Sequence, residues 1–212
     1  LRWCFGATAR WLLLALLTVA GLLLAANFGE LSRATATQLG HGRMLILLWI
    51  AYPIVKALHE LAHAFAVKAY GGEVHEMGVT LLLLTPVPYV DASASIAFED
   101  KRKRVVVGAA GIAAELLLAS AALVLWLLLE PGLPRDAALA VLFIGGVSTL
   151  LINGNPLLRF DGYHVLCDAL ELPNLAQRSQ RVWQALGKRL ALGRAPDSAE
   201  NVRGSERAWL IA

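Results

Sequence analysis

Long apolar runs alternate with short polar segments along this chain. An α-helix rises about 1.5 Å per residue, so about 20 consecutive apolar residues cross the hydrocarbon core of a bilayer. The two middle runs reach that length, and the two outer runs approach it with flanking residues. The pattern predicts an all-α polytopic membrane protein with about four transmembrane helices, at residues 11–28, 44–66, 105–129 and 137–152.

The first run has a second interpretation. Arg10 precedes it, and the small residues Ala25 and Ala26 lie near its end, as in a cleaved signal peptide. Its apolar stretch is longer than the usual signal-peptide core, which favours a retained membrane helix.

A shorter apolar stretch at residues 79–90 cannot cross a bilayer as a helix. It contains Pro86 and Pro88, and proline removes a backbone donor and interrupts a helix. We expect a β-like or re-entrant loop that dips into the bilayer beside a shielded cavity. The alternative is a loop at the membrane interface.

Composition supports the membrane interpretation. Hydrophobic residues make up 58% of the chain, whereas about 45–50% is typical of soluble domains. The net charge is +3, but the basic residues flank apolar runs. This arrangement indicates orientation in a lipid bilayer and gives no reason to expect nucleic acid as a partner.

The basic residues also predict a topology. A basic cluster at residues 101–104 precedes the third run, and further arginines and lysines follow the fourth. By the positive-inside rule, both termini and residues 99–104 lie in the cytoplasm, and residues 29–43 and 130–136 lie outside. We therefore expect a multi-pass protein of the cell (inner) membrane.

Three parts follow from this organisation. Residues 1–43 hold an N-terminal membrane helix and an external loop, and residues 44–172 form the core. Residues 173–212 are a basic tail in which Trp183, Leu186 and Leu190 have helical spacing, as in an amphipathic helix on the membrane surface. A solvated tail helix is the alternative. The chain begins with Leu1, so we expect a fragment of a longer protein.

The candidate chemistry begins at the end of the second run, where His59, Glu60 and His63 form an H-E-x-x-H motif. Residues i and i+4 share one face of a helix, so both imidazoles can bind one zinc ion while Glu60 takes a proton from an activated water. Ionisable residues at membrane depth are costly and usually functional. Histidines at the membrane interface are the alternative.

A catalytic zinc ion usually has three protein ligands. Asp161 is the candidate third ligand, because it follows the helix-breaking Pro156 and precedes the conformationally free Gly162. The predicted topology brings it and His59 toward the cytoplasmic half of the bilayer, where they can meet at one ion. The alternative is that Asp161 caps a helix after the membrane.

These residues resemble the site-2 protease family of intramembrane zinc metalloproteases. That family carries H-E-x-x-H on one membrane helix and an Asn-Pro…Asp-Gly motif on another, here at residues 59–63 and 155–162. Residues 155–164 are similar to a bacterial branch of peptide zinc metalloproteases, often fused to export-adaptor-like segments. The resemblance covers roughly residues 44–172.

The resemblance implies a metalloendopeptidase that binds one zinc ion through His59, His63 and Asp161. Glu60 is then the general base for hydrolysis of membrane-protein or peptide substrates. Export-adaptor-like domains are expected partners in a longer chain.

Four further residues are candidates for roles in the site. By resemblance, Asn155 and the neighbouring Asn153 help to hold the substrate. The third helix departs from the family pattern Ala-Gly-Pro-x-x-Asn, because Glu115 stands in the last position. Glu115 either orients a ligating histidine or is protonated and bonded to backbone. His164 either supports the site or is an interface histidine.

Two other functions remain open. A protease-like scaffold of a peptide-export assembly would carry the same motifs with an idle metal site. A membrane metal transporter would use buried acidic groups and histidines as a permeation path, although here they gather at one depth.

Overall fold

The computed structural model describes residues 5–172 and residues 175, 177, 179, 180 and 184. Two compact units are present, one ending at Leu166 and the other beginning at Cys167. The fold below is that of the first unit. The predicted amphipathic tail helix with Trp183, Leu186 and Leu190 lies outside the described residues.

Within the described residues, four helical segments are long and apolar enough to cross a membrane. They are α1 (Ala7–Ala26), α3 (Gly42–Ala69), α4 (Lys101–Leu128) and a fourth segment, Leu133–Asn153. The prediction of an all-α polytopic membrane protein is thereby confirmed. Many leucines on α1 are exposed, as expected where lipid covers a helix.

The fourth span changes its helical geometry partway. It begins as α5 (Leu133–Leu142) with a proline in its first turn and continues as the wider π-helix η3 (Phe143–Asn153). In η3, Gly145 lies against the backbone of α4. A Cβ atom built on Gly145 would lie 2.8 Å from the carbonyl oxygen of Glu115. Only glycine therefore permits this approach of the two spans.

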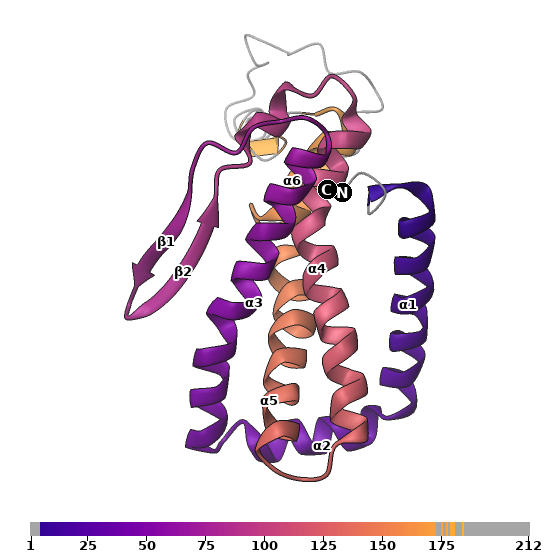
Figure 1. Ribbon diagram of the computed structural model, residues 1–212, viewed down its shortest axis with the longest axis vertical. Helices are drawn as coiled ribbons and strands as arrows, with labels where there is room; N and C mark the ends of the chain where they lie inside the picture. Colours follow the sequence, from indigo (N-terminus) through magenta and orange to yellow (C-terminus); the bar gives the residue numbers. More distant parts are fainter. Residues whose placement is uncertain (1–4, 173–174, 176, 178, 181–183, 185–212) are drawn as a thin grey trace, which may run out of the picture. The chain divides into compact units, whose positions relative to one another are not determined.

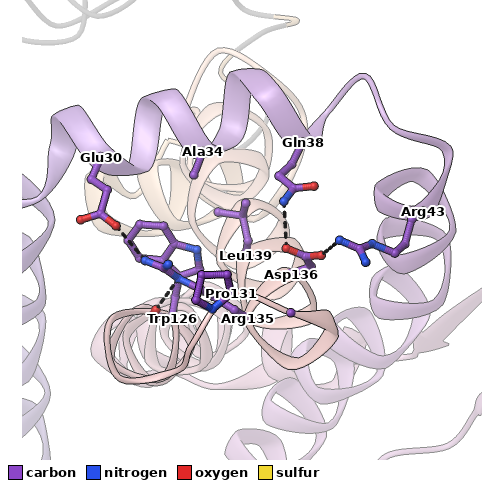
Figure 2. A pocket seen from close by; sticks show the side chains of 10 residues that line it. Glu30, Ala34, Gln38, Arg43, Trp126, Pro131, Arg135, Asp136 and Leu139 are labelled. Atoms are coloured by element: carbon purple, nitrogen blue, oxygen red, sulfur yellow. Dashed lines mark hydrogen bonds and ion pairs between the residues drawn. The ribbon is translucent and has the colours of Figure 1, made fainter.

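A short helix, α2 (Phe28–Gln38), crosses one end of the bundle (Figure 1). This helix was not predicted from the apolar runs because its sequence is largely polar. Arg135 donates to Glu30 across 2.8 Å, and its guanidinium stacks over the Trp126 ring. Gln38 and Arg43 both donate to the buried carboxylate of Asp136 (Figure 2).

These contacts surround a pocket of about 360 Å³ whose charged groups are paired with one another. A buried apolar cluster lies next to it and joins α3, α4 and the fourth span; its members are Met44, Ala51, Val55, Trp126, Ala138, Leu139, Ala140 and Ile144. The α2 end of the bundle is therefore held by packing and ion pairs.

Residues 79–90 lie in a β-hairpin made of β1 (Met77–Leu82) and β2 (Thr85–Val90), which lies alongside α3 (Figure 1). The β-like form expected for this stretch is therefore the one observed. The two turn residues, Leu83 and Leu84, have φ angles of 47° and 64°. Tight hairpins normally place Asn-Gly at such left-handed positions. Here exposed leucines occupy them, 93% and 79% accessible.

The hairpin leads through the 3₁₀ turn η2 (Ser93–Ala97) to α4. Asp100 caps α4 by accepting a hydrogen bond from the Arg102 backbone. Near the hairpin base, hydrogen bonds from the hydroxyl and backbone N–H of Ser93 lower the pKa of Asp91. After the fourth span, an irregular segment at residues 154–160 contains Pro156 and precedes α6 (Asp161–Leu170). The predicted break near Pro156 is present.

Substituting Gly145 tests the close contact between η3 and α4. We expect Gly145→Ala to destabilise the protein by about 1–3 kcal/mol, because its Cβ meets backbone that cannot rotate away. Gly146→Ala is the matched control, since its nearest contacts would be at 3.9 Å. Thermal unfolding in detergent measures the stability of both variants. Equal stability of the two variants would contradict the packing argument.

Candidate metal centre

The H-E-x-x-H motif lies in the second half of α3, where one face of the helix is turned into the bundle. His59 and His63 are both buried, and their Nε2 atoms lie 3.1 Å apart. They are four positions apart, so they occupy successive turns of the same face. The sequence expectation that both imidazoles share one face is met in the structure.

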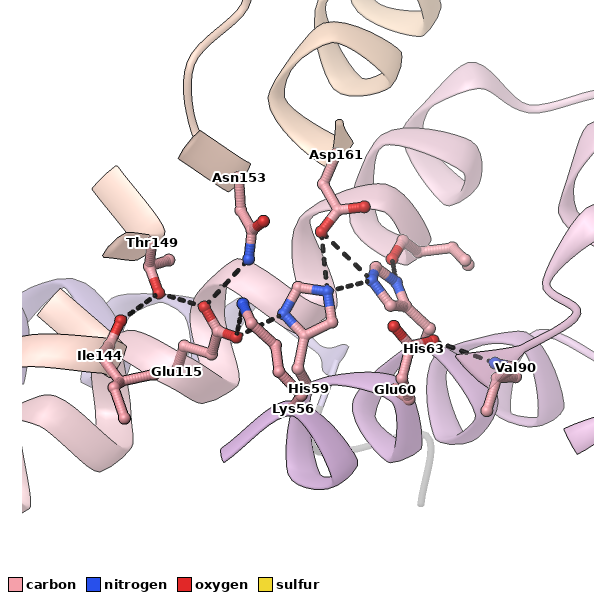
Figure 3. A network of polar contacts seen from close by, with 11 residues as sticks. Lys56, His59, Glu60, His63, Val90, Glu115, Ile144, Thr149, Asn153 and Asp161 are labelled. Carbon is pink, nitrogen blue, oxygen red and sulfur yellow. Dashed lines mark hydrogen bonds and ion pairs between the residues drawn. The ribbon is translucent and has the colours of Figure 1, made fainter. Parts of the chain in front are cut away.

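Asp161, the first residue of α6, meets these imidazoles (Figure 3). Its Oδ2 atom lies 2.8 Å from Nε2 of His59 and 3.4 Å from Nε2 of His63. The alternative role as a helix cap is not supported: within the described residues its carboxylate accepts no backbone hydrogen bond. Asp161, which lies about 100 residues further along the chain, is thus brought together with the two histidines.

The three atoms have the spacing that a zinc ion requires. With bonds of about 2.0–2.1 Å, adjacent ligand atoms of a tetrahedral zinc site lie about 3.3 Å apart. The separation of 3.4 Å is already at this value, and those of 2.8 and 3.1 Å need only small outward shifts to reach it. Two imidazoles and one carboxylate also form a ligand set found in catalytic zinc sites. The residues present therefore fit one zinc ion.

The orientation of His63 is set by the backbone of α4. Its Nδ1 atom lies 2.7 Å from the carbonyl oxygen of Val107. A carbonyl oxygen can only accept, so Nδ1 carries the proton and donates it. In a neutral imidazole this leaves Nε2, the nitrogen that faces Asp161, as the atom that can bind a metal.

Space for an ion depends on Gly111 of α4. A Cβ atom at this position would lie 2.5 Å from the Nε2 atoms of both His59 and His63. Any side chain there would occupy the volume between the ligands. The structure therefore gives a physical reason for glycine at this position.

Glu115 connects the histidine helix to the fourth span. Its Oε1 atom accepts from Lys56 across 2.6 Å. Its Oε2 atom accepts from Thr149 and, across 3.1 Å, from Asn153. Oε1 also lies 3.1 Å from Nδ1 of His59. That contact is not aligned as a hydrogen bond, and Nδ1 is a buried atom without a hydrogen-bond partner among the described residues.

The Glu115 carboxylate nevertheless lies within hydrogen-bond distance of Nδ1, and a carboxylate in this place commonly orients metal-binding histidines. Of the two interpretations of Glu115, the contacts favour the one in which it orients a ligand. The carboxylate is also ion-paired with Lys56, whereas the other interpretation requires it to be protonated and bonded to backbone.

Glu60, the predicted base, is half-buried on α3 beside the two histidines. Its Oε2 atom accepts a hydrogen bond of 3.1 Å from the backbone N–H of Val90 in the hairpin (Figure 3). The hairpin therefore contacts the motif directly.

The remaining predicted residues differ in their placement. Asn153 is buried and donates to Glu115 instead of facing open space. Asn155 uses its side-chain oxygen to accept from the Leu157 backbone, which closes a turn. His164 is exposed, and its ring contacts that of Tyr163. Within the described residues its side chain makes no hydrogen bond or ion pair with the three candidate ligands.

Sequence reasoning missed Lys56, Val107 and Thr149. Lys56 precedes His59 by three positions and so shares its face, a spacing that could have drawn attention to it. Val107 contributes only a backbone oxygen, and Thr149 carries no pattern that marks it. Neither has a signal in the sequence.

The chain matches no known family model, and no curated protein or solved structure is significantly similar to it.

The space beside Gly111 generates a prediction. Gly111→Ala should reduce bound zinc to background, because the added methyl group takes the volume of the ion. Gly108→Ala, one turn earlier on α4, is the control: its Cβ would meet only a methyl group of Val165, which can move. Metal content by mass spectrometry after purification with limiting zinc measures the effect. Full zinc occupancy in Gly111→Ala would exclude this site.

A second prediction concerns the ion pair between Glu115 and Lys56. Glu115→Gln leaves Lys56 charged, unpaired and largely shielded from solvent, so we expect a loss of about 3–5 kcal/mol in stability. We also expect about 10- to 100-fold weaker zinc binding, because His59 loses an orienting group. The double variant with Lys56→Met should recover stability but not zinc affinity. Chelator competition and unfolding in detergent separate the two effects. Recovery of zinc affinity as well would contradict the orienting role.

Proposed function

We propose that this protein is an intramembrane zinc metalloprotease that hydrolyses peptide bonds of membrane-associated or peptide substrates. One observation carries the proposal: a carboxylate from a distant segment, Asp161, lies against both histidines of an H-E-x-x-H motif. The motif alone occurs by chance in unrelated chains. A third candidate ligand beside a motif that lies on a helix long and apolar enough to cross a membrane makes a chance arrangement a poor explanation.

In this proposal each residue has one task. When bound, a zinc ion supplies a Lewis acid and makes water nucleophilic near neutral pH. His59, His63 and Asp161 hold it, and the Val107 carbonyl keeps His63 in its binding tautomer. Glu60 takes the proton of the attacking water and returns it to the leaving amine.

A peptide must be extended to reach such a site, because a helix keeps its carbonyl groups hydrogen-bonded. The hairpin offers one strand edge for pairing with it. On β1, the outward positions Met77, Val79 and Leu81 have backbone N–H and C=O groups that no described residue satisfies. We propose that this edge receives the substrate and that the exposed leucines of the turn lie in hydrocarbon.

Localisation follows the charge distribution. We propose a cell (inner) membrane protein with its site toward the cytoplasmic side, as the positive-inside rule favours. The site and the α2 end are well separated, since Arg43 and His59 lie about 24 Å apart along α3 at 1.5 Å per residue.

The transporter alternative has less support. A permeation path needs polar groups spread across the bilayer. Here the polar side chains form one cluster around His59 and another at α2, whose charges are paired with each other. A large apolar cluster lies between α3 and the fourth span near α2.

The decisive experiment separates metal binding from cleavage. We expect one zinc ion per chain, lost in Asp161→Ala and retained in Glu60→Gln. We expect Glu60→Gln to lower cleavage by about 100-fold or more, since the base is removed. Fluorescein-labelled casein and a labelled single-span membrane peptide in nanodiscs serve as probes.

His164→Ala is the control and should keep both zinc and cleavage, because His164 is exposed. Unchanged cleavage in Glu60→Gln would refute the enzyme and favour the scaffold alternative. Unchanged zinc content in Asp161→Ala would refute the ligand set.

A further inference from the structure

The register of the hairpin decides which backbone groups of β2 face the metal centre. In an antiparallel pair, residues alternate between positions bonded to the partner strand and positions directed outward. The backbone N–H of Asp91 donates to the carbonyl oxygen of Glu76 across 2.9 Å. Asp91 therefore faces β1, and the alternation directs residues 86, 88 and 90 outward.

Two of those outward positions are prolines. Pro86 and Pro88 have no N–H group, so their placement leaves the hydrogen bonds within the hairpin intact. The same placement removes two donors from the outer edge of β2. Val90 is then the only outward residue of β2 with an N–H, and that N–H donates to Glu60.

Glu60 depends on this contact for its orientation. Its Oε1 atom accepts no hydrogen bond within the described part of the chain, and Oε2 accepts only from Val90. A glutamate side chain has several rotatable bonds, so an unrestrained carboxylate samples many positions. The backbone N–H of Val90 fixes Oε2 of Glu60 and leaves Oε1 available to accept a proton.

We propose that the backbone N–H of Val90 positions the Glu60 carboxylate, which makes Val90 a positioning residue of the site. This inference rests on the proposed function, in which Glu60 is the base. It also assigns the β2 edge a role different from that of β1. The β2 edge holds the base and cannot act as a regular pairing strand, because it lacks alternate donors.

Because a backbone group makes the contact, the proposal predicts an unusual pattern of tolerance. Val90→Ala and Val90→Thr keep the N–H and should retain the hydrogen bond to Glu60, so each should lose much less cleavage than Val90→Pro. Val90→Pro removes it while repeating the proline pattern already present at two equivalent outward positions of β2. Its hairpin should therefore form normally.

A measurement that needs no substrate tests the contact itself. Amide hydrogen exchange of a peptide covering residues 85–91, in nanodiscs, reports the amides of β2. In Glu60→Ala the backbone N–H of Val90 loses its acceptor, so one slow amide of this peptide should exchange faster. In Glu60→Gln that amide should stay slow, because the side-chain oxygen of glutamine still accepts the hydrogen bond. Identical exchange in these two variants would overturn the inference, whether or not the protein is a protease.

Kinetics with labelled casein test the consequence. Val90→Pro should lower kcat by up to roughly 100-fold, the effect of a misplaced catalytic group, with little change in KM. Its zinc affinity should equal that of the parent, because no ligand contacts Val90. Unchanged kcat, or an equal loss in Val90→Ala, would overturn the positioning role. A parent protein that cleaves no probe would instead refute the proposed function, and the exchange result would still stand.

Discussion

Two imidazoles and a carboxylate inside an apolar bundle must satisfy one another or share a cation, and the surrounding structure meets this requirement. Asp161 reaches His59 and His63 from a segment that follows the fourth span. Leaving any of these groups unpaired at membrane depth would cost several kcal/mol. The same demand explains why Glu115, fully buried, is paired with Lys56 and accepts two further hydrogen bonds.

Close approach of backbones makes these contacts possible. Gly111 lets α4 pass beside the two imidazoles, and Gly145 lets η3 pass beside α4. Membrane helices gain no hydrophobic driving force against each other, so small residues at contact points determine how tightly they pack. Here that packing also determines the space available to an ion.

The sequence allowed the spans to be predicted because length and apolarity suffice to identify a membrane helix. It allowed His59, Glu60 and His63 to be placed on one face because helical periodicity is local. Asp161 was predicted from the chemistry of zinc, which needs a third ligand. Some features were not predicted because they depend on neighbours that are distant in sequence. These are the helix α2, the π-helix, and the contacts of Lys56 and Thr149.

The amino-acid sequence by itself determined the number of apolar spans, the residue types of the candidate site and the impossibility of a helix through Pro86 and Pro88. These properties follow from hydropathy, spacing and the missing N–H of proline. Only the tertiary structure decided that Asp161 meets the histidines, that Gly111 keeps their centre open, and that β2 turns its single outward amide toward Glu60. Distances between segments and strand register arise from packing, which no local pattern specifies.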